Sequence, residues 1–411
     1  MQKNSNDIQV MLAEDKTTCC GCGLCTALCP KDAIRMQEDK NGYRYPVINT
    51  ELCIKCKRCL NHCAYKKENS GTVPLEVFAS SAKDKQLLQQ AASGGIFGAL
   101  ALRILNAGGT VFGSALEQEN GKLIPRHVMI NNQANLPKIQ GSKYVQSITD
   151  DVFALVQKEV QTGKPVLFSG TPCQVDAVKE LIDSQKYPDF YTIDIICHGV
   201  PSVRMFQDYI SEQEKKTGRT VTDMKFREKV KGWGLKGSIT YRFPDGSVKR
   251  KLVPVNTSSY YRLFLTSEIY RENCYQCKYA SQKRTGDITI GDYWGIENEH
   301  PEYLQNEQLN PEEGISCILV NTARGKKLLS QYGTDLTLLP SSFEKASRKN
   351  EQLTRPSHKG KNRETILKIY EQHGYHGIEQ WYLKKQGAKV ILYWFWNRIP
   401  PKLQKKLKKN S

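Results

Sequence analysis

Short apolar runs and amphipathic segments alternate along the middle of the chain. Three runs have the length and composition of buried β-strands, namely Thr110–Ala115, Lys164–Phe168 and Tyr191–Ile196. A segment that opens at Ala91 predicts an apolar helix, and a second helix is predicted over Gln174–Leu181. Strands that alternate with helices in this way are typical of an α/β domain.

Two other segments alternate between apolar and polar positions. Residues 238–253 do so around Pro244-Asp245-Gly246, which predicts a β-hairpin. Near the amino terminus, Ala33–Met36 and Tyr43–Ile48 flank a turn and predict two short strands. We therefore expect an α+β or α/β fold in which a small amino-terminal unit precedes a larger α/β part.

Nine of the fourteen cysteines lie before residue 64, in two runs with the same spacing. The runs are Cys19-x2-Cys22-x2-Cys25-x3-Cys29 and Cys53-x2-Cys56-x2-Cys59-x3-Cys63. Each cysteine of the second run follows its counterpart by 34 residues, which indicates an internal duplication. Cys20 is outside the spacing, because Ile54 occupies the matching position in the second run.

This spacing favours [4Fe–4S] clusters. Three thiolates in a tight loop can reach three irons of one cube, and in two-cluster ferredoxins the fourth cysteine of each run serves the other cluster. We therefore assign one cluster to Cys19, Cys22, Cys25 and Cys63, and the other to Cys53, Cys56, Cys59 and Cys29. The alternative is a pair of structural zinc sites, which usually use cysteine pairs rather than triplets.

Two later cysteines follow predicted strands. Cys173 and Cys197 come just past the carboxyl ends of the runs at 164–168 and 191–196, where open α/β sheets form their ligand crevices. With Cys274-x2-Cys277 they make four thiols, enough for a third cluster or a zinc site. Cys317 has apolar neighbours and is predicted to be a core thiol.

Seven short motifs occur in order after the cysteine runs. They are SGGIF (93–97), GSKY (141–144), GTPCQ (170–174), CHGVP (197–201), FREKVKGW (226–233), NCYQC (273–277) and GDITIGDYWG (286–295). Together they resemble the β subunit family of coenzyme F420-reducing hydrogenases and dehydrogenases, with a two-cluster ferredoxin domain in front. The resemblance covers about residues 10–325.

The resemblance implies a domain that holds FAD and a third [4Fe–4S] cluster. Carried onto this chain, the third cluster's ligands are Cys173, Cys197, Cys274 and Cys277. The implied flavin contacts are Ser93, Gly94, Gly95 and Lys143, with Thr171 and Gln174 beside the third cluster. Ser93-Gly94-Gly95 at a helix start also suits a phosphate, although an ordinary capped helix has the same sequence.

Charged residues near the last motif are candidates for the reaction. Arg284, Asp287 and Asp292 either order the site, meet substrate or form local salt bridges. With Lys143, the two aspartates are the catalytic candidates. The chain has neither GxGxxG nor the GxxxxGK[ST] loop, so the sequence gives no support for a standard NAD site or ATPase.

These motifs divide the chain into six parts. They are a two-cluster ferredoxin-type domain (10–68), a linker (69–78), the first part of the flavin domain (79–160), a second part with the third cluster (161–345), a helical extension (346–387) and a basic aromatic tail (388–411).

The function expected is that of an iron–sulfur flavoprotein oxidoreductase. Clusters carry single electrons and hydride chemistry needs two, so a flavin is the natural converter. The redox partner expected is ferredoxin or another reduced carrier such as F420. The substrate is a small molecule, with F420 and surface-polysaccharide intermediates as the two hypotheses. An electron-transfer subunit without substrate chemistry and a zinc-stabilised binding protein are the alternatives.

Charge changes this picture only at the carboxyl end. The chain has a formal net charge of +18, and residues 380–411 contain nine Lys or Arg and no Asp or Glu. The body is therefore only moderately basic, and we expect no nucleic-acid partner. Val390–Trp396 followed by lysines predicts either an anchor on anionic membrane or a terminal helix packed on the body. A polar amino terminus predicts a cytoplasmic protein, which the anchor would make peripheral on the inner membrane face.

Overall fold

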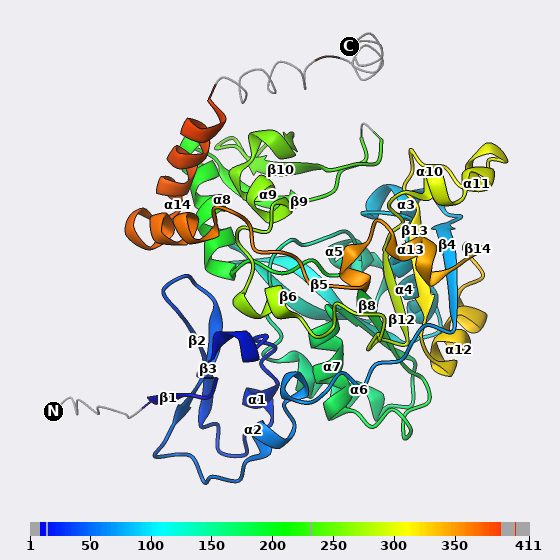
Figure 1. Cartoon of the computed structure of the whole chain (residues 1–411), viewed down its shortest axis with the longest axis horizontal. Coiled ribbons are helices and arrows are strands. Elements are labelled where there is room, and N and C mark those ends of the chain that lie inside the picture. The colour runs from blue at the N-terminus through cyan, green and yellow to red at the C-terminus, as the bar shows by residue number, and fades with distance from the viewer. Residues whose placement is uncertain (1–8, 14, 231, 388–398, 400–411) are drawn as a thin grey trace.

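The computed structural model describes residues 9–13, 15–230, 232–387 and 399. The described chain forms an amino-terminal unit with a three-stranded sheet, a body built on an eight-stranded sheet, and a second three-stranded sheet covered by helices (Figure 1). The predicted tail at 388–411, with its membrane contact, lies outside the described residues apart from Ile399. Within the described chain, no helix has the length and apolar character needed to cross a membrane.

The amino-terminal unit contains the predicted hairpin. Strand β2 (Ile34–Glu38) pairs antiparallel with β3 (Arg44–Asn49), which also pairs with β1 (Gln9–Met11). A four-residue helix lies within each cysteine run, α1 (Leu24–Ala27) in the first and α2 (Arg58–Asn61) in the second. The two helices occupy equivalent places in the duplication.

The central sheet has the strand order β14-β4-β13-β12-β8-β7-β5-β6. Its strands are β4 (Glu76–Ala82), β5 (Thr110–Glu119), β6 (Lys122–Ile130), β7 (Val166–Gly170), β8 (Phe190–Ile195), β12 (Ile288–Asp292), β13 (Ser316–Val320) and β14 (Leu336–Ser341). Strands β5, β7, β8 and β12 are parallel neighbours, and the other pairs are antiparallel. The three predicted buried strands are thus adjacent, which supports the α/β prediction. Strand β4 begins at Glu76, inside the segment expected to be a linker.

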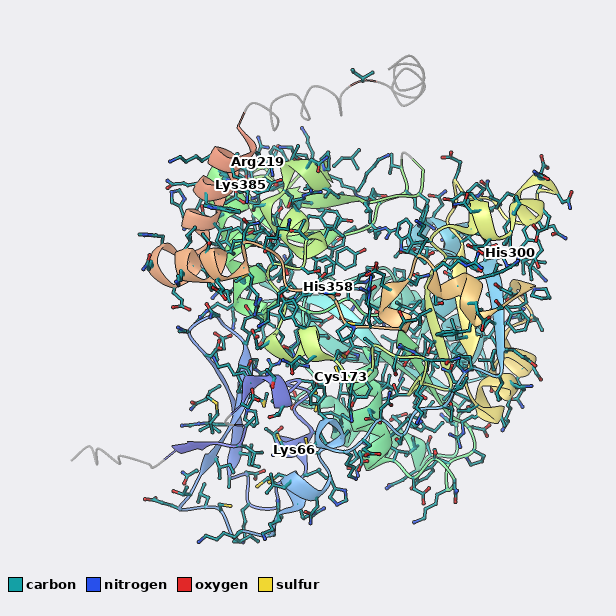
Figure 2. The ribbon with its side chains drawn as sticks, viewed as in Figure 1. Lys66, Cys173, Arg219, His300, His358 and Lys385 are labelled. Carbon is teal, nitrogen blue, oxygen red and sulfur yellow. The ribbon has the colours of Figure 1, made fainter. Side chains whose placement is uncertain are left out.

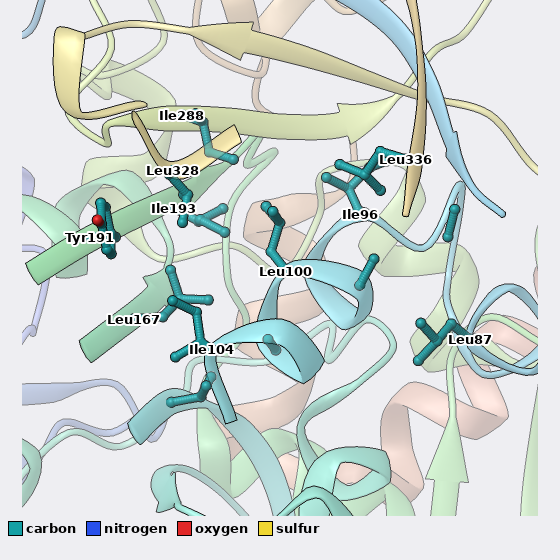
Figure 3. Close-up of a cluster of buried hydrophobic side chains, with 14 of the residues drawn as sticks. Leu87, Ile96, Leu100, Ile104, Leu167, Tyr191, Ile193, Ile288, Leu328 and Leu336 are labelled. Carbon is teal, nitrogen blue, oxygen red and sulfur yellow. The ribbon is translucent and has the colours of Figure 1, made fainter. Parts of the chain in front are cut away.

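Apolar side chains cover both faces of this sheet. On one face, α4 (Ile96–Asn106) and α12 (Ala323–Tyr332) pack on side chains that include Leu167 and Ile193 (Figure 3). On the other face, α6 (Val152–Val160) and α7 (Pro172–Leu181) pack on alternate residues of the same strands. Burying one such leucine or isoleucine contributes about 1.5–3 kcal/mol, so this core fixes the strand ends that carry the site.

The second small sheet has the order β11-β10-β9. Its strands are β9 (Thr220–Lys225), β10 (Lys236–Arg242) and β11 (Val248–Pro254), of which β10 and β11 form the predicted hairpin. Helices α8 (Val203–Thr217), α9 (Ser259–Leu265) and α14 (Arg363–Gln386) share its apolar core. Helix α14 is interrupted at Gly374, whose φ is +60°.

Short elements complete the described chain. The short α-helices are α3 (Lys85–Gln90), α5 (Leu136–Ile139), α10 (Ile296–Glu299), α11 (Pro301–Gln305) and α13 (Phe343–Ser347). The 3-10 turns are Lys16–Thr18, Ala64–Lys66, Gln133–Asn135, Val255–Thr257, Glu272–Gln276 and Glu351–Leu353.

Polar contacts hold the amino-terminal unit against the body. The buried Tyr43 hydroxyl donates to the carbonyls of Ile269 and Tyr270, both at 3.1 Å. The Ser202 hydroxyl donates to the Asn41 carbonyl at 2.9 Å. Figure 2 labels Cys173 near this boundary, so the first cysteine of the body lies close to the amino-terminal unit.

Candidate functional site

The structure brings Cys63 to the first cysteine run. Burial raises the pKa of the Cys25 thiol well above its usual value, and the nearby charges of Cys22, Cys19 and Cys63 act in the same direction. The fourth cysteine of the second run is therefore close to three of the first. This is the proximity that the crossed assignment requires.

The second group is assembled in the complementary way. Burial raises the pKa of Cys59, and the nearby charges of Cys29 and Cys53 add to this effect. Cys56 of the same run is exposed. The second group therefore lies nearer to solvent.

Four later cysteines line one cavity. They are the predicted third set, Cys173, Cys197, Cys274 and Cys277. Cys173 is in the first turn of α7, Cys197 follows β8, and the other two belong to the turn at 272–276 and the residue after it. The fold thus gathers four thiols from three separate segments, and we call this space the thiol cavity.

Cys20 also lines the thiol cavity. It is 5% exposed, and its thiol is hydrogen-bonded to the sulfurs of Cys173 and Cys22. These hydrogen bonds raise the pKa of Cys20 well above its usual value, and the Cys20 hydrogen bond lowers the pKa of Cys173 to about 7. Cys20, which has no counterpart in the second cysteine run, therefore lies between the first run and the third cysteine set.

Arg271 joins the same two groups. Its Nε donates to the Cys19 carbonyl at 3.0 Å, and a terminal nitrogen lies 3.8 Å from the Cys19 sulfur. The other terminal nitrogen donates to Gln146 Oε1 at 3.3 Å, and the guanidinium lies 4.0 Å from the Tyr45 ring centre. The side chain is fully buried, and among the described residues it has no carboxylate partner.

A buried cation is costly unless a negative group compensates it. For Arg271, the Cys19 sulfur, 3.8 Å from a terminal nitrogen, is a group that would carry negative charge as a cluster ligand. Gly21 permits this approach, because a Cβ there would lie 2.8 Å from the Arg271 guanidinium carbon, and its φ is +65°. The first cysteine loop is thus shaped around this guanidinium.

A second and larger cavity adjoins the first, and we call it the large cavity. Of the residues predicted from the motifs, those that line it are Ser93, Gly95, Lys143, Thr171, Gln174 and Asp292. Thr171, Gln174 and Cys197 line both cavities. The two spaces therefore share a wall at the carboxyl ends of β7 and β8, at the sheet edge where ligands bind in open α/β folds.

The cap of α7 builds this shared wall. Gln174 Oε1 accepts from the Thr171 amide at 3.1 Å, and Gln174 Nε2 donates to the Ser147 carbonyl at 3.0 Å. The Thr171 hydroxyl lies 3.2 Å from the Cys173 sulfur. Thr171 therefore touches the third cysteine set, and both residues line the thiol cavity as well as the large cavity.

Two predicted site residues lie elsewhere. The Gly94 amide donates to the Ser316 hydroxyl at 3.0 Å, and a Cβ at Gly94 would lie 2.5 Å from the Ser80 carbonyl oxygen. Asp287 is buried and accepts from the Thr192 amide at 2.9 Å and from the Thr322 hydroxyl at 2.8 Å. Neither residue is among the described residues that line a cavity, so close packing and fold-stabilising hydrogen bonds account for them.

Lys143 is the cation of the large cavity. Its Nζ donates to the carbonyls of Lys138 and Gln140 at 3.1 and 2.8 Å. Burial nevertheless lowers the pKa of Lys143 to about 7, with Asp223 opposing the shift. Its charge is thus sensitive to pH near neutrality.

Asp292 faces the large cavity and is paired. Its carboxylate lies 2.9 Å from a terminal nitrogen of the buried Arg227, which belongs to the FREKVKGW motif. The Arg227 guanidinium also lies 5.3 and 5.6 Å from the ring centres of Trp233 and Trp294. Asp292 therefore both orders this corner and presents charge to the cavity.

Arg284 orders the thiol cavity, which it lines. It is buried, pairs with Asp194 at 3.4 Å, and donates to the Tyr279 carbonyl at 2.7 Å. The sequence leaves three roles open for Arg284, and its contacts match two of them, ordering the site and forming a local salt bridge.

Sequence reasoning did not identify His127. This histidine of β6 lines the large cavity, stacks on Phe168 with ring centres 5.2 Å apart, and contacts Ser147 Oγ at 2.9 Å and the Ser169 carbonyl at 3.0 Å. Burial lowers its pKa to about 4, so the ring is neutral near pH 7. Its neighbours in sequence form no motif, and only the pairing of β6 with β5 brings it to the site.

Tyr144 and Phe264 were also not identified as a pair. Their rings are stacked with centres 4.3 Å apart, and both line the large cavity. They are 120 positions apart, so no local pattern could connect them.

Within the described chain, no three His, Cys, Asp or Glu side chains are spaced to hold a single metal ion.

Comparisons with known proteins match two parts of the chain. The family model for the C-terminal part of the coenzyme F420 hydrogenase/dehydrogenase beta subunit matches residues 163–340, and a 4Fe-4S dicluster domain matches residues 18–67. An uncharacterized ferredoxin of Methanocaldococcus jannaschii is 37% identical over 54 residues, which are 13% of this chain and 69% of the ferredoxin.

A solved structure is also similar to the chain. It is the xenon-derivatized F420-reducing [NiFe] hydrogenase complex from Methanosarcina barkeri, at 18% identity over 74% of this chain and 95% of that chain, with a TM-score of 0.41. From the two matched families, the protein is an iron–sulfur electron-transfer protein. The chain therefore carries the C-terminal region of the coenzyme F420 hydrogenase/dehydrogenase β subunit family at residues 163–340 and a 4Fe-4S dicluster domain at residues 18–67.

Proposed function

We propose that the protein is a flavin- and [4Fe–4S]-dependent oxidoreductase. In this account, electrons pass between the two amino-terminal clusters, a third cluster in the thiol cavity and a flavin in the large cavity, where a small molecule reacts. The observation that carries the proposal is the wall shared by the two cavities, built by Thr171, Gln174 and Cys197. A one-electron centre and a two-electron centre held there would be adjacent.

The donor sets fit iron–sulfur clusters. The proposed ligands are Cys19, Cys22, Cys25 and Cys63 for the inner cluster, Cys53, Cys56, Cys59 and Cys29 for the outer cluster, and Cys173, Cys197, Cys274 and Cys277 for the third. Cys20 is not a ligand in this assignment. Its side chain would lie between the inner and third clusters, because it is hydrogen-bonded to Cys22 and Cys173, a proposed ligand of each.

The large cavity fits a flavin with a phosphate-bearing side chain. It is the larger of the two cavities, and its lining combines residues from several separate segments. Ser93 and Gly95 precede the amino terminus of α4, whose amides favour an anion, and Lys143 adds a positive charge. Gly94 lies between Ser93 and Gly95 and stays a proposed contact through its remaining backbone atoms, since its amide donates to the Ser316 hydroxyl.

The flavin would supply exchange of electron pairs with substrate and of single electrons with the clusters. The chain's own residues would bind and position it. The Tyr144–Phe264 stack offers a flat apolar wall, and the neutral His127 holds Ser147 and the end of β7 in place. Asp292, held by Arg227, is the remaining candidate for contact with substrate.

Two substrate classes are proposed for this cavity, F420 and an intermediate of surface-polysaccharide biosynthesis. They differ in electron carrier, because F420 would itself exchange an electron pair at the flavin. Turnover assays with reduced F420 and with reduced ferredoxin plus sugar nucleotides distinguish them.

Anaerobic purification with iron, sulfide, zinc and flavin analysis tests the cofactor set. The proposal predicts about twelve irons per chain and one flavin. About eight irons without flavin would instead indicate an electron-transfer subunit without substrate chemistry. Zinc without iron would contradict both.

A further inference from the structure

The two cysteine loops have the same backbone shape but opposite surroundings. Gly21 and Gly23 of the first loop have φ values of +65° and +79°, and Lys55 and Lys57 at the equivalent positions have +57° and +59°. A four-residue helix begins at the next residue in each loop. The second loop is therefore a structural copy of the first.

The first loop uses one face to contact the body. Cys20 is 5% exposed at the thiol cavity, and Leu24 is 2% exposed in the core beneath α6 and α7. Gly21 lies against Arg271. Through this face, the first loop meets another redox site of the same chain.

The second loop presents the equivalent face to solvent. Ile54, which matches Cys20, is 57% exposed, and Arg58, which matches Leu24, is also exposed. Cys56 is the exposed cysteine of this group. The face that joins the first loop to an internal site is thus exposed to solvent in the second loop.

The lysines of the second loop are conformationally unfavourable. Left-handed backbone is strained for residues with a Cβ and unstrained for glycine, which the first loop has at both positions. Lys55 and Lys57 are exposed, and among the described residues neither forms an ion pair. Packing does not explain why lysine stands there, which points to a use for the two charges outside the chain.

Apolar side chains complete this surface. Leu52 is 52% exposed and Leu60 is 39% exposed, and with Ile54 they flank the exposed Cys56. Lys55, Lys57 and Arg58 add three positive charges among them. An apolar centre with charged neighbours is the composition of a transient protein interface.

We propose that this surface, formed by residues 52–60, docks an acidic one-electron carrier protein of the ferredoxin type. The inference rests on the proposed function, because it assigns the partner of the outer cluster. The carrier gives up one electron and is oxidised, the cluster at Cys56 gains that electron and is reduced, and no bond or proton moves. Two such encounters supply the pair that a two-electron reaction consumes. The basic side chains select a negatively charged carrier and speed its encounter.

Charge reversal tests the proposal on the complete holoprotein. The variant is K55E/K57E/R58E, and the matched control is R242E/K249E/K251E, which makes the same charge change on exposed residues of β10 and β11. The probe is an acidic bacterial two-[4Fe–4S] ferredoxin, with Kd measured by calorimetry at several salt concentrations. We expect the first variant to bind at least about tenfold more weakly with a smaller salt dependence, and the control to bind like the unaltered protein.

A second variant avoids added repulsion. K55G/K57G gives the second loop the residues that the first loop already has, so it retains the backbone and removes only the two charges. We expect full iron content, unchanged reduction by dithionite and a Kd raised by about threefold or more.

Three results would overturn the docking proposal. The first is that both loop variants bind ferredoxin as tightly as the unaltered protein does, and the second is that the control variant weakens binding as much as the loop variants do. The third is that the loop variants lose binding to phosphatidylglycerol vesicles while they keep ferredoxin binding, which would make the surface a lipid contact. Failure of the proposed function is distinguishable, because it would appear as unaltered protein that lacks the expected iron.

Discussion

Arg271→Gln tests how the inner cluster is held and tuned. The substitution removes the positive charge while leaving a side chain that can still donate one hydrogen bond. Arg271 is buried, and one of its terminal nitrogens lies 3.8 Å from the Cys19 sulfur. An electron added to a cluster ligated by Cys19 is stabilised by this charge, so its removal should make the inner cluster harder to reduce.

The size of the effect follows from the distance. Two unit charges 3.8 Å apart interact by about 4 kcal/mol at an effective dielectric constant of about 20. The added electron is spread over the whole cluster, which reduces the interaction to about 2 kcal/mol. For a one-electron couple this corresponds to a potential lower by roughly 80–90 mV.

An electron paramagnetic resonance titration at controlled potential measures this shift. Arg271→Lys is the matched control, since it keeps the charge and changes the hydrogen bonds to Cys19 and Gln146. We expect a lower potential in Arg271→Gln and a nearly unaltered one in Arg271→Lys, with full iron content in both. Equal potentials in all three proteins would refute the reasoning that the guanidinium compensates the cluster's charge.

Three further predictions concern single side chains. Cys20→Ala should leave the iron content unchanged while Cys22→Ala lowers it, and the reverse result in iron analysis would mean that the register of the first run is wrong. Because burial lowers the pKa of Lys143 to about 7, flavin affinity should fall as pH rises above about 7, and fluorescence titration should show no such fall in Lys143→Met. In the flavin-free protein, the Lys143 ammonium loses its proton at a lower pH in the folded state than in the unfolded state. Its contribution therefore makes the free energy of unfolding rise between about pH 7 and pH 10. A free energy of unfolding that falls over this range in the unaltered protein, relative to Lys143→Met, would contradict the burial argument. Asp292→Asn leaves the buried Arg227 without its carboxylate and should cost about 3–5 kcal/mol, which calorimetry would record as a lower melting temperature; an unchanged temperature would show that the two tryptophan rings suffice to hold Arg227.

Local patterns predicted the elements of this fold well. The hairpins at β2–β3 and β10–β11 and the three adjacent strands β5, β7 and β8 follow from period-two alternation and apolar runs that nearby residues determine. Strand β4 was missed, because its residues Glu76–Ala82 gain their partners from β13 and β14, more than 230 positions later.

The site was predictable where chemistry fixes spacing. The thiols of the third set are gathered as the motifs imply, because each follows a strand end or a tight turn. Contacts between distant segments were not predictable. Arg271 and Cys20 are 251 positions apart, and the place of Cys20 in the lining of the thiol cavity depends on how two distant parts of the chain pack together. The hydrogen bond from the Gly94 amide to Ser316 was not predictable for a related reason, since Ser316 belongs to a strand formed much later in the chain.

The central claim is that a third cluster lies in the thiol cavity beside a flavin. The most direct test is the iron and flavin content of Cys277→Ala measured against the unaltered protein after anaerobic purification. The account predicts that about four of twelve irons are lost while the flavin and the signals of the two amino-terminal clusters are retained. Identical iron content in the two proteins would contradict it.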